Sequence, residues 1–511
     1  MTSNRSISKI IWLFVGTLIV LPRLLRLAAP QVHIEDPNYI YGAFLIMKGM
    51  VPFADFAQVN PPLLESLIAV LYSIFNVTYR IPEIMSAIAY CVTAIILVRL
   101  GERFYSAAAG IAAAMFYSWH FLVFRYHVFE RETFATLAIF LALDLMTRKK
   151  SDKSSFLSAG LLMGFGFGCK QTAIVSFAVI LVFLGFVRKE WRRAFHLLCG
   201  FAFFAGLISV GYSLAFGRLY MDQIFWFHFI KGFVAPWYIK AYWTWGELGF
   251  MVPPMLAGLW FLRRLQSDWN WLWPAMIAAD LVFFWVVSGA FWPHYLLSTL
   301  PAAALLSGMF LAGVMEFLQR KTKKKDDHLE TTNSNNLRGN WSVLASLMTI
   351  LIGVLGAQLY LPKGLVGTGS TEHYGFSGIS RTEISEVGKA IRDNTAEDDW
   401  IISDPFIGLE AQRIKVVRFK DNWGLILWMQ QMMERGEYRD AVRTLSKLPF
   451  GEIRMKSHRY WMPLVETAFA MNKVGAVQPN YELPLDDAFL LSKNMHIVYQ
   501  SDHYTIWAKE R

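Results

Sequence analysis

Long apolar segments recur through the first 362 residues, and they constrain the fold more than any other feature of this sequence. A transmembrane helix needs about 20 mostly apolar residues to cross a bilayer. Nine segments approach or exceed that length, with approximate ranges 7–24, 81–100, 105–124, 132–147, 194–216, 247–264, 271–289, 295–317 and 341–361. A further stretch, 156–187, is interrupted by Lys170 and Gln171, and we expect two short helices that meet there. The pattern predicts a polytopic α-helical membrane protein.

Charge is distributed unevenly between the two parts of the chain. Residues 363–511 hold 19 basic and 20 acidic side chains, a density typical of a soluble domain. Residues 1–362 hold 30 basic and 19 acidic side chains, so the body carries the whole basic excess. Basic loops between apolar segments are typical of the cytoplasmic flanks of membrane helices and not of a nucleic-acid-binding face. We therefore expect a lipid bilayer as partner and no nucleic acid.

The basic clusters also set the predicted number of crossings. All of them lie in the cytoplasm if the N-terminus is cytoplasmic and if the apolar stretch 63–76 does not cross. That stretch is short, contains Glu65 and follows Pro61-Pro62, so we expect a surface or re-entrant helix. The clusters are Arg99/Arg103, Arg148–Lys150 with Lys153, Arg188/Lys189/Arg192/Arg193, Arg263/Arg264 and Arg320–Lys325. Eleven crossings result, in the inner or plasma membrane of the cell.

Two domains follow from this topology. Residues 1–362 are expected to form the transmembrane module, whose large first outside loop spans 25–80, and the polar linker 319–340 is expected to be flexible. Residues 363–511 form an extracytoplasmic mixed α/β domain. Its expected elements are helices near 383–394 and 436–447, a strand near 400–404, and two strands within 496–509.

Acidic residues gather in two of the predicted outside loops. Glu35 and Asp36 follow the first crossing, and Glu130, Arg131 and Glu132 lie together in the short loop before the fourth. A carboxylate at the edge of a membrane cavity can accept a proton from a hydroxyl or bind a metal ion. Solvated surface acids and a simple salt-bridged loop are the alternative interpretations of the two groups.

Lys170 interrupts an apolar stretch. A charged side chain is energetically costly there, so we interpret it as a candidate functional residue. It can pair with the phosphate of a lipid donor, or it can extend its ammonium group to the interface from a helix end. His294 and Tyr295 lie at the outside end of another crossing, where an interfacial aromatic belt is the alternative. Asp144 and Asp280 lie within predicted helices, and we interpret both as hydrogen-bonded packing acids outside the site.

Short motifs follow one another in order along residues 1–317. They are Glu35-Asp36-Pro37-Asn38-Tyr39, Gly49-Met50-Val51-Pro52-Phe53-Ala54-Asp55-Phe56, Asn60-Pro61-Pro62, Glu132 at the opening of the fourth crossing, Cys169-Lys170-Gln171-Thr172-Ala173, and Pro293-His294-Tyr295-Leu296-Leu297. Together they resemble the GT-C glycosyltransferases that use polyprenyl-phosphate sugars, in the branch of the protein O-mannosyltransferases and the lipid A aminoarabinose transferases.

The resemblance implies a set of site residues. Catalytic roles fall to Glu35, Asp36 and Glu132, and the order of the first two leaves open which of them is the base. Asn60 stands where some relatives have a lysine, so the phosphate contact falls on Lys170, Arg131 or His294. The full set of implied donor- or substrate-binding residues is Lys170, Arg131, His294, Tyr295, Tyr39, Asp55 and Glu130.

The implied reaction is an inverting transfer from a polyprenyl-phosphate-linked sugar to a glycan, lipid or protein acceptor, without a covalent enzyme intermediate. A divalent cation, Mg²⁺ or Mn²⁺, is an open possibility at Glu35, Asp36 and Glu132. Two alternatives remain at this stage: a transporter or flippase of a lipid-linked solute, and a ligase that joins glycans from lipid carriers. The helix break at Lys170 fits a transporter, but the chain shows no matching second half.

Overall fold

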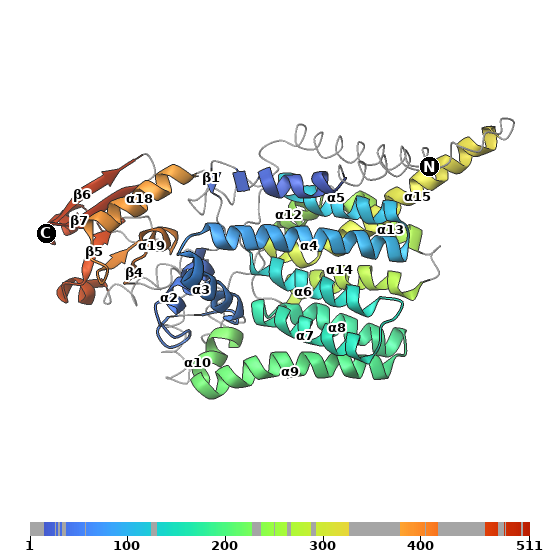
Figure 1. The fold of residues 1–511 in the computed structure, drawn as a ribbon, viewed down its shortest axis with the longest axis horizontal. Coiled ribbons are helices and arrows are strands. Elements are labelled where there is room, and N and C mark those ends of the chain that lie inside the picture. The colour runs from blue at the N-terminus through green and yellow to red at the C-terminus, as the bar shows by residue number, and fades with distance from the viewer. Residues whose placement is uncertain are drawn as a thin grey trace.

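The structure is a computed structural model of the chain (Figure 1). It describes residues 15–25, 27–28, 31–32, 37–56, 58–123, 130–226, 237–249, 251–262, 267–287, 293–326, 379–403, 405–416, 465–478, 485, 487–501 and 504–510. The predicted crossing 341–361 and the predicted helix 436–447 lie outside these residues.

Apolar helices form the larger part of the molecule, and α4, α7 and α9 run along its long axis (Figure 1). Four described helices are long and apolar enough to cross a membrane, so the protein is a multi-pass membrane protein. The helix bounds are Val15–Leu25, α2 Pro37–Met47, α3 Leu63–Phe75, α4 Arg80–Phe104, α5 Ala107–Val123, α6 Arg131–Met146, α7 Lys153–Cys169, α8 Ala173–Val182, α9 Trp191–Phe216, α10 Arg218–Met221, α12 Trp237–Leu248, α13 Val252–Leu262, α14 Leu272–Val282 and α15 Leu300–Asp326. π-Helical segments at Phe183–Val187 and Phe283–Val287 extend α8 and α14, and a third spans Asp222–Trp226.

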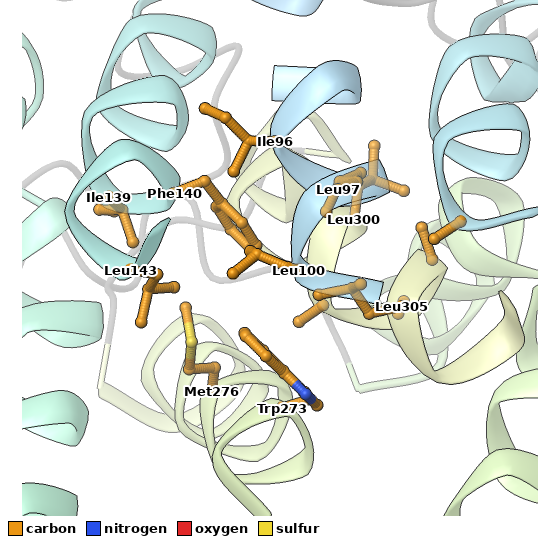
Figure 2. Close-up of a cluster of buried hydrophobic side chains, with 14 of the residues drawn as sticks. Ile96, Leu97, Leu100, Ile139, Phe140, Leu143, Trp273, Met276, Leu300 and Leu305 are labelled. Atoms are coloured by element: carbon orange, nitrogen blue, oxygen red, sulfur yellow. The ribbon is translucent and has the colours of Figure 1, made fainter. Parts of the chain in front are cut away.

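The main hydrophobic core lies where α4, α6, α14 and α15 meet (Figure 2). Leu97 and Leu100 of α4 lie beside Phe140 of α6, whose ring stacks on Trp273 of α14 with centroids 6.4 Å apart. Lipid tails are as apolar as these side chains, so a membrane helix gains little from leaving lipid. Close side-chain packing of this kind therefore supplies much of the attraction between membrane helices. The core is thus a contact among helices that are far apart in the sequence.

Small residues bring α7 and α9 close together. Gly160 of α7 faces Gly200 of α9, and a Cβ added at Gly200 would overlap the carbonyl oxygen of Leu157. Backbones approach this closely in membranes only where glycine or another small residue leaves room. The close packing fixes the position of α7, whose last residue precedes Lys170.

The helix α3 begins and ends at the same end of the bundle. Leu63, its first residue, fills the space beside Gly168 at the end of α7. Tyr79, which follows the helix, packs its ring on Phe406 of the C-terminal domain, with centroids 5.3 Å apart. This is the arrangement predicted for a segment that does not cross. We refer to this end, which faces the C-terminal domain, as the domain-facing end.

Two predicted segments differ from the structure. The span 247–264 was expected as one helix, but α12 ends at Leu248 and α13 starts at Val252. Gly249 and the prolines Pro253-Pro254 explain the break, because proline is favoured in a first turn and excluded from a helix interior. The helix expected from residue 295 starts at Leu300, after a 3₁₀ segment at Pro293–Ser298, and extends to Asp326. The first part of the linker 319–340 is therefore helical, since Lys and Arg are good helix formers.

The C-terminal domain is the expected small α/β unit. Its sheet has the order β4-β3-β5-β7-β6, with β3 parallel to its two neighbours and β7 antiparallel to its own. The bounds are β3 Trp400–Ile402, β4 Ile414–Lys415, β5 Val474–Val477, β6 Met495–Gln500, β7 Thr505–Lys509, α18 Arg381–Asn394, α19 Pro405–Ala411 and α23 Asp487–Ser492. The two terminal strands and the helix near 383–394 confirm the prediction for those segments.

The C-terminal domain shares a core with the first outside loop. Buried side chains of α2 and α3 form one hydrophobic cluster with those of α18 and α19. The Tyr41 hydroxyl donates to the Arg413 carbonyl at 3.1 Å and accepts from the Lys415 N–H at 2.7 Å. Strand β1, Gln31–Val32, pairs with β2, Ile379–Ser380. The domain therefore contacts the chain on both sides of the Glu35-Asp36 pair.

Candidate active site at the domain-facing end

Three consecutive charged residues lie buried where α6 begins. Glu130, Arg131 and Glu132 are each less than 5% exposed, although they open a helix next to a predicted loop. Successive side chains on a helix point about 100° apart, so neighbours in the sequence reach different surroundings. Each of the three indeed meets a different set of elements, and together they form the centre of the candidate site.

Glu132 lies beside Lys170 in the break between α7 and α8. The Lys170 Nζ is 2.8 Å from Glu132 Oε1, and both side chains are buried. The same ammonium lies 5.1 Å from the centroid of the Tyr295 ring. The break exists as predicted, because α7 ends at Cys169 and α8 starts at Ala173. Three of the residues chosen from the sequence are thus brought together from three separate helical segments.

Arg131 turns instead toward the surface helix α3. Its Nη2 is 2.6 Å from Oε1 of Glu65, which is fully buried. The Gln58 amide donates to the same carboxylate oxygen at 2.6 Å. The guanidinium carbon of Arg131 lies 5.0 Å from the Tyr39 ring centroid, a cation–π geometry that links it to α2. A second buried cation is therefore paired with a carboxylate, one position before Glu132 on the same helix.

A third cation, Arg23, stacks on Tyr90 near the start of α6. Its guanidinium carbon is 3.4 Å from the ring centroid, and its side chain is 5% exposed. Glu130 and Arg23 both interact electrostatically with Tyr90. The three charged residues at the start of α6, Glu130, Arg131 and Glu132, thus interact with Tyr90, Glu65 and Lys170 respectively.

Hydrogen bonds extend the site to the segment that follows α10. The Gln223 side-chain oxygen accepts from the Gln58 backbone N–H at 2.7 Å, and its amide donates to the Phe53 carbonyl at 3.1 Å. Gln223 lies in the π-helical segment after α10, and Phe53 packs on Tyr220 of α10 with ring centroids 5.3 Å apart. Gln223, Gln58, Glu65 and Arg131 therefore belong to one hydrogen-bonded network.

Other predicted site residues lie elsewhere. Asp55 is exposed on a turn, where its carboxylate accepts from the Val51 N–H at 2.8 Å, so the structure does not bring it to the buried cluster. Glu35 and Asp36 lie outside the described residues, as does the His294 side chain.

The two acids that we excluded from the site are packing acids, as expected. Asp144 lies at the opposite end of α6, within 3.7 Å of arginine nitrogens of Arg99, Arg103 and Arg148. Asp280 accepts from the hydroxyls of Ser298 and Thr299 at 2.8 and 3.0 Å.

Two site residues were not among the predicted site residues. Glu65 was used only as an argument against a crossing, and Arg23 was given no role in the site. Both are charged side chains next to apolar segments, and charges of that kind are functional hypotheses by default. That signal, applied to every charge in the first 100 residues, would have found both.

The described residues contain no group of three His, Cys, Asp or Glu side chains that could hold a metal ion. Glu132, one of the three suggested ligands, already forms an ion pair with Lys170. The other two suggested ligands, Glu35 and Asp36, lie outside the described residues.

Glu65, Glu130, Arg131, Glu132 and Lys170 lie in a part of the chain that matches a family model. Residues 59–212, which run from just before α3 to α9, match the model described as dolichyl-phosphate-mannose-protein mannosyltransferase. No curated protein sequence matches the chain. Solved structures give the overall comparison: ArnT from Cupriavidus metallidurans bound to undecaprenyl phosphate superposes with a TM-score of 0.63 at 12% identity, over 97% of this chain and 98% of the other.

The fold is of the GT-C type. The oligosaccharyltransferase of Archaeoglobus fulgidus in its apo form is also similar, with a TM-score of 0.51 at 12% identity, over 92% of this chain and 69% of the other. The resemblance predicted from the motifs is thereby confirmed, and the match to ArnT extends it across the C-terminal domain. This GT-C architecture and the family match together support a glycosyltransferase activity.

Proposed function

We propose that this protein is an integral membrane glycosyltransferase. It moves a sugar from a polyprenyl-phosphate donor to a glycan, lipid or protein acceptor outside the cytoplasm. The similar structures favour this donor class, because ArnT was solved with undecaprenyl phosphate and the archaeal oligosaccharyltransferase AglB with a dolichol-phosphate and an inhibitory peptide. The donor carries an anionic phosphate, and its chain requires a site that borders lipid.

The observation that carries the proposal is a set of two buried cations, each paired with a buried carboxylate. Lys170 and Arg131 are each less than 7% exposed. Lys170 pairs with Glu132 in the first turn of α6, and Arg131, the residue before Glu132, pairs with Glu65 of α3. Buried ion pairs add little net stability, because desolvation offsets their attraction. Two buried ion pairs that involve consecutive residues of α6 are therefore better explained by the binding of an anionic ligand than by a contribution to folding stability.

The proposed reaction is a single displacement at the anomeric carbon. A carboxylate of Glu35 or Asp36 accepts the proton of the acceptor hydroxyl, whose oxygen then bonds to the anomeric carbon. The bond from that carbon to the phosphate oxygen breaks, and its electron pair leaves with polyprenyl phosphate. Because attack and departure occur on opposite faces, the configuration inverts. Lys170 and Arg131 stabilise the charge that develops on the leaving phosphate.

The site faces away from the cytoplasm in this proposal. The end of the bundle opposite the C-terminal domain carries the arginines around Asp144, and Arg188 with Glu190 and Asp268. Basic residues mark the cytoplasmic end of membrane helices. The N-terminus is then cytoplasmic, the C-terminal domain extracytoplasmic, and the protein resides in the cell membrane.

Separate E35Q and D36N variants test the proposal with a radiolabelled polyprenyl-phosphate sugar as donor. The variant that removes the base is expected to lose about 10²- to 10⁴-fold in transfer rate. E397Q is the matched control, because Glu397 is an exposed acid that pairs with Lys48 far from the buried cations. Full activity in both acidic variants would contradict the assignment.

The same assay separates transfer from transport. Release of polyprenyl phosphate from the labelled donor indicates transfer, whereas donor that crosses a liposome membrane unchanged indicates a flippase. A glycan ligase would release the carrier only when a glycan acceptor is supplied.

A further inference from the structure

Glu65 forms the tightest set of polar contacts in the site, although the proposed reaction gives it no role. Its Oε1 accepts from Arg131 Nη2 and from the Gln58 amide, both at 2.6 Å. The side chain is fully buried, and Arg131 is 4% exposed. Gln58 also donates to the Asn60 carbonyl at 2.8 Å, which fixes the amide that faces the carboxylate. Glu65 is thus held in one orientation by groups from two elements.

The contacts of Glu65 fix the charge and the position of Arg131 together. The guanidinium is held between the carboxylate and the ring of Tyr39. A carboxylate at 2.6 Å offsets most of the field that this guanidinium would exert on another anion, because charge interactions are strong in a buried site. Arg131 therefore acts on a phosphate as a partly compensated cation.

The negative charge of Glu65 beside Arg131 affects product release, because the product of the proposed reaction keeps the phosphate. Transfer of the sugar leaves polyprenyl phosphate, a monoester with one more ionisable oxygen than the donor. Uncompensated cations would bind this product more tightly than the donor and would slow its departure. A counter-charge beside one of the cations lowers the affinity for the product.

We propose that Glu65 is a positioning residue that holds Arg131 in place and lowers the affinity of Arg131 for the phosphate, so that polyprenyl phosphate is released after transfer. The inference rests on the proposed function and names a step within it, the release of the phosphate product. Glu65 acts through Arg131 and does not touch the reacting atoms.

The test is the E65Q variant, with farnesyl phosphate as the probe in a binding and product-inhibition assay. Glutamine keeps the size of the side chain and an oxygen that accepts from Arg131 and Gln58, but removes the charge. One unit charge at this range is worth about a tenfold change in affinity. We expect farnesyl phosphate to bind about tenfold more tightly, and kcat and the donor KM to fall together. A purely structural role predicts weaker binding instead.

D144N is the matched control, because Asp144 is a buried acid on the same helix as Arg131 that pairs with arginines at the opposite end. It is expected to lower stability and to leave the affinity for farnesyl phosphate unchanged. If E65Q does not fold, E65D retains the charge, draws the carboxylate back from Arg131, and is expected to bind the probe about threefold more tightly.

Unchanged or weaker binding in the folded variant would overturn the inference while leaving the proposed function intact. A wild-type protein that does not bind farnesyl phosphate at all would overturn the proposed function, and the inference with it.

Discussion

At the scale of single residues, the start of α6 shows how a short run of charges can serve several partners. Glu130, Arg131 and Glu132 are adjacent in the sequence, yet Arg131 and Glu132 bind Glu65 and Lys170 on different elements. The helix separates their directions by about 100° per residue, so each side chain extends to its own neighbour. This geometry gives each of the two cations, Arg131 and Lys170, a buried carboxylate partner from a different element.

Replacement of Lys170 by methionine is expected to lower the transfer rate by about 10²- to 10³-fold, because one donor to the leaving phosphate is lost. It also leaves Glu132 buried without the ammonium, which costs about 3–5 kcal/mol of stability. The measurements are kcat/KM and the melting temperature in detergent. The K170M/E132Q double variant is the control, since it removes both charges: stability is expected to recover and activity is not. Recovery of activity in the double variant would contradict the role of Lys170 in the reaction.

At the scale of elements, close helix contacts place the site. The α7–α9 crossing at Gly160 and Gly200 fixes α7, and α7 ends at the residue before Lys170. The break itself follows from the sequence Gly168-Cys169-Lys170-Gln171, whose Lys170 backbone is extended with φ −153° and ψ 121°. The extended residue directs the chain from α7 into α8. The position of the ammonium therefore depends on helix packing some ten residues away.

A G200A substitution is expected to destabilise the protein by about 1–3 kcal/mol, because the added methyl group overlaps backbone of α7 and the two helices must separate. The same helix offers matched controls in Gly206 and Gly211, where an added Cβ meets no atom within 4 Å. G206A and G211A are expected to leave stability unchanged or to raise it slightly, because alanine is the better helix former. Thermal unfolding in one detergent compares all three variants, and equal melting temperatures would argue against a close α7–α9 contact.

At the scale of the whole molecule, the C-terminal domain and the first outside loop form one packed unit. Arg381, at the start of α18, binds both carboxylate oxygens of Glu83 at 2.5 and 3.0 Å, and Glu83 lies in the first turn of α4. Tyr41 of α2 bonds to the backbone of Arg413 and Lys415. These contacts lie at α2 and α4, so the C-terminal domain is fixed to elements that follow Glu35 and Asp36 in the sequence.

The stability of this unit is expected to depend on pH through Glu410 of α19. Burial raises the pKa of Glu410 to about 7, although the Tyr79 N–H and the charges of Arg392 and Arg80 favour the ionised form. The unfolded chain has a carboxyl pKa of about 4.3, so the folded state binds the extra proton between these values. The contribution of Glu410 to the free energy of unfolding is therefore fully present below about pH 4.5 and falls by about 3 kcal/mol as pH rises through 7.

Melting temperatures of the wild type and of E410Q from pH 5 to 8 measure this effect. The difference between the two proteins isolates Glu410 from all other titrating groups. The wild type is expected to lose stability relative to E410Q across that range, and a constant difference would contradict the contribution of Glu410.

Some features of the protein follow from local sequence alone. The apolar segments predict membrane helices, because the transfer free energy of each segment depends on its own side chains. The break at Lys170, the short helix after Pro61-Pro62 and the two last strands were predicted for the same reason, since each is a local pattern of charge, proline or alternation. Residue types likewise indicated an anionic lipid ligand, and Glu132, Lys170 and Tyr295 were named before their contact was known.

Only the tertiary structure decided which of these residues meet. Lys170 lies 38 positions after Glu132 in the sequence, and Arg131 lies 66 positions after Glu65. Their pairing depends on how each helix is rotated and on which helices are neighbours, and neither property is encoded in the hydropathy of a single segment. The same holds for the core that α2 and α3 share with α18 and α19, because its two halves come from opposite ends of the chain. Hydropathy is a local property of a segment, whereas a site is made by long-range packing.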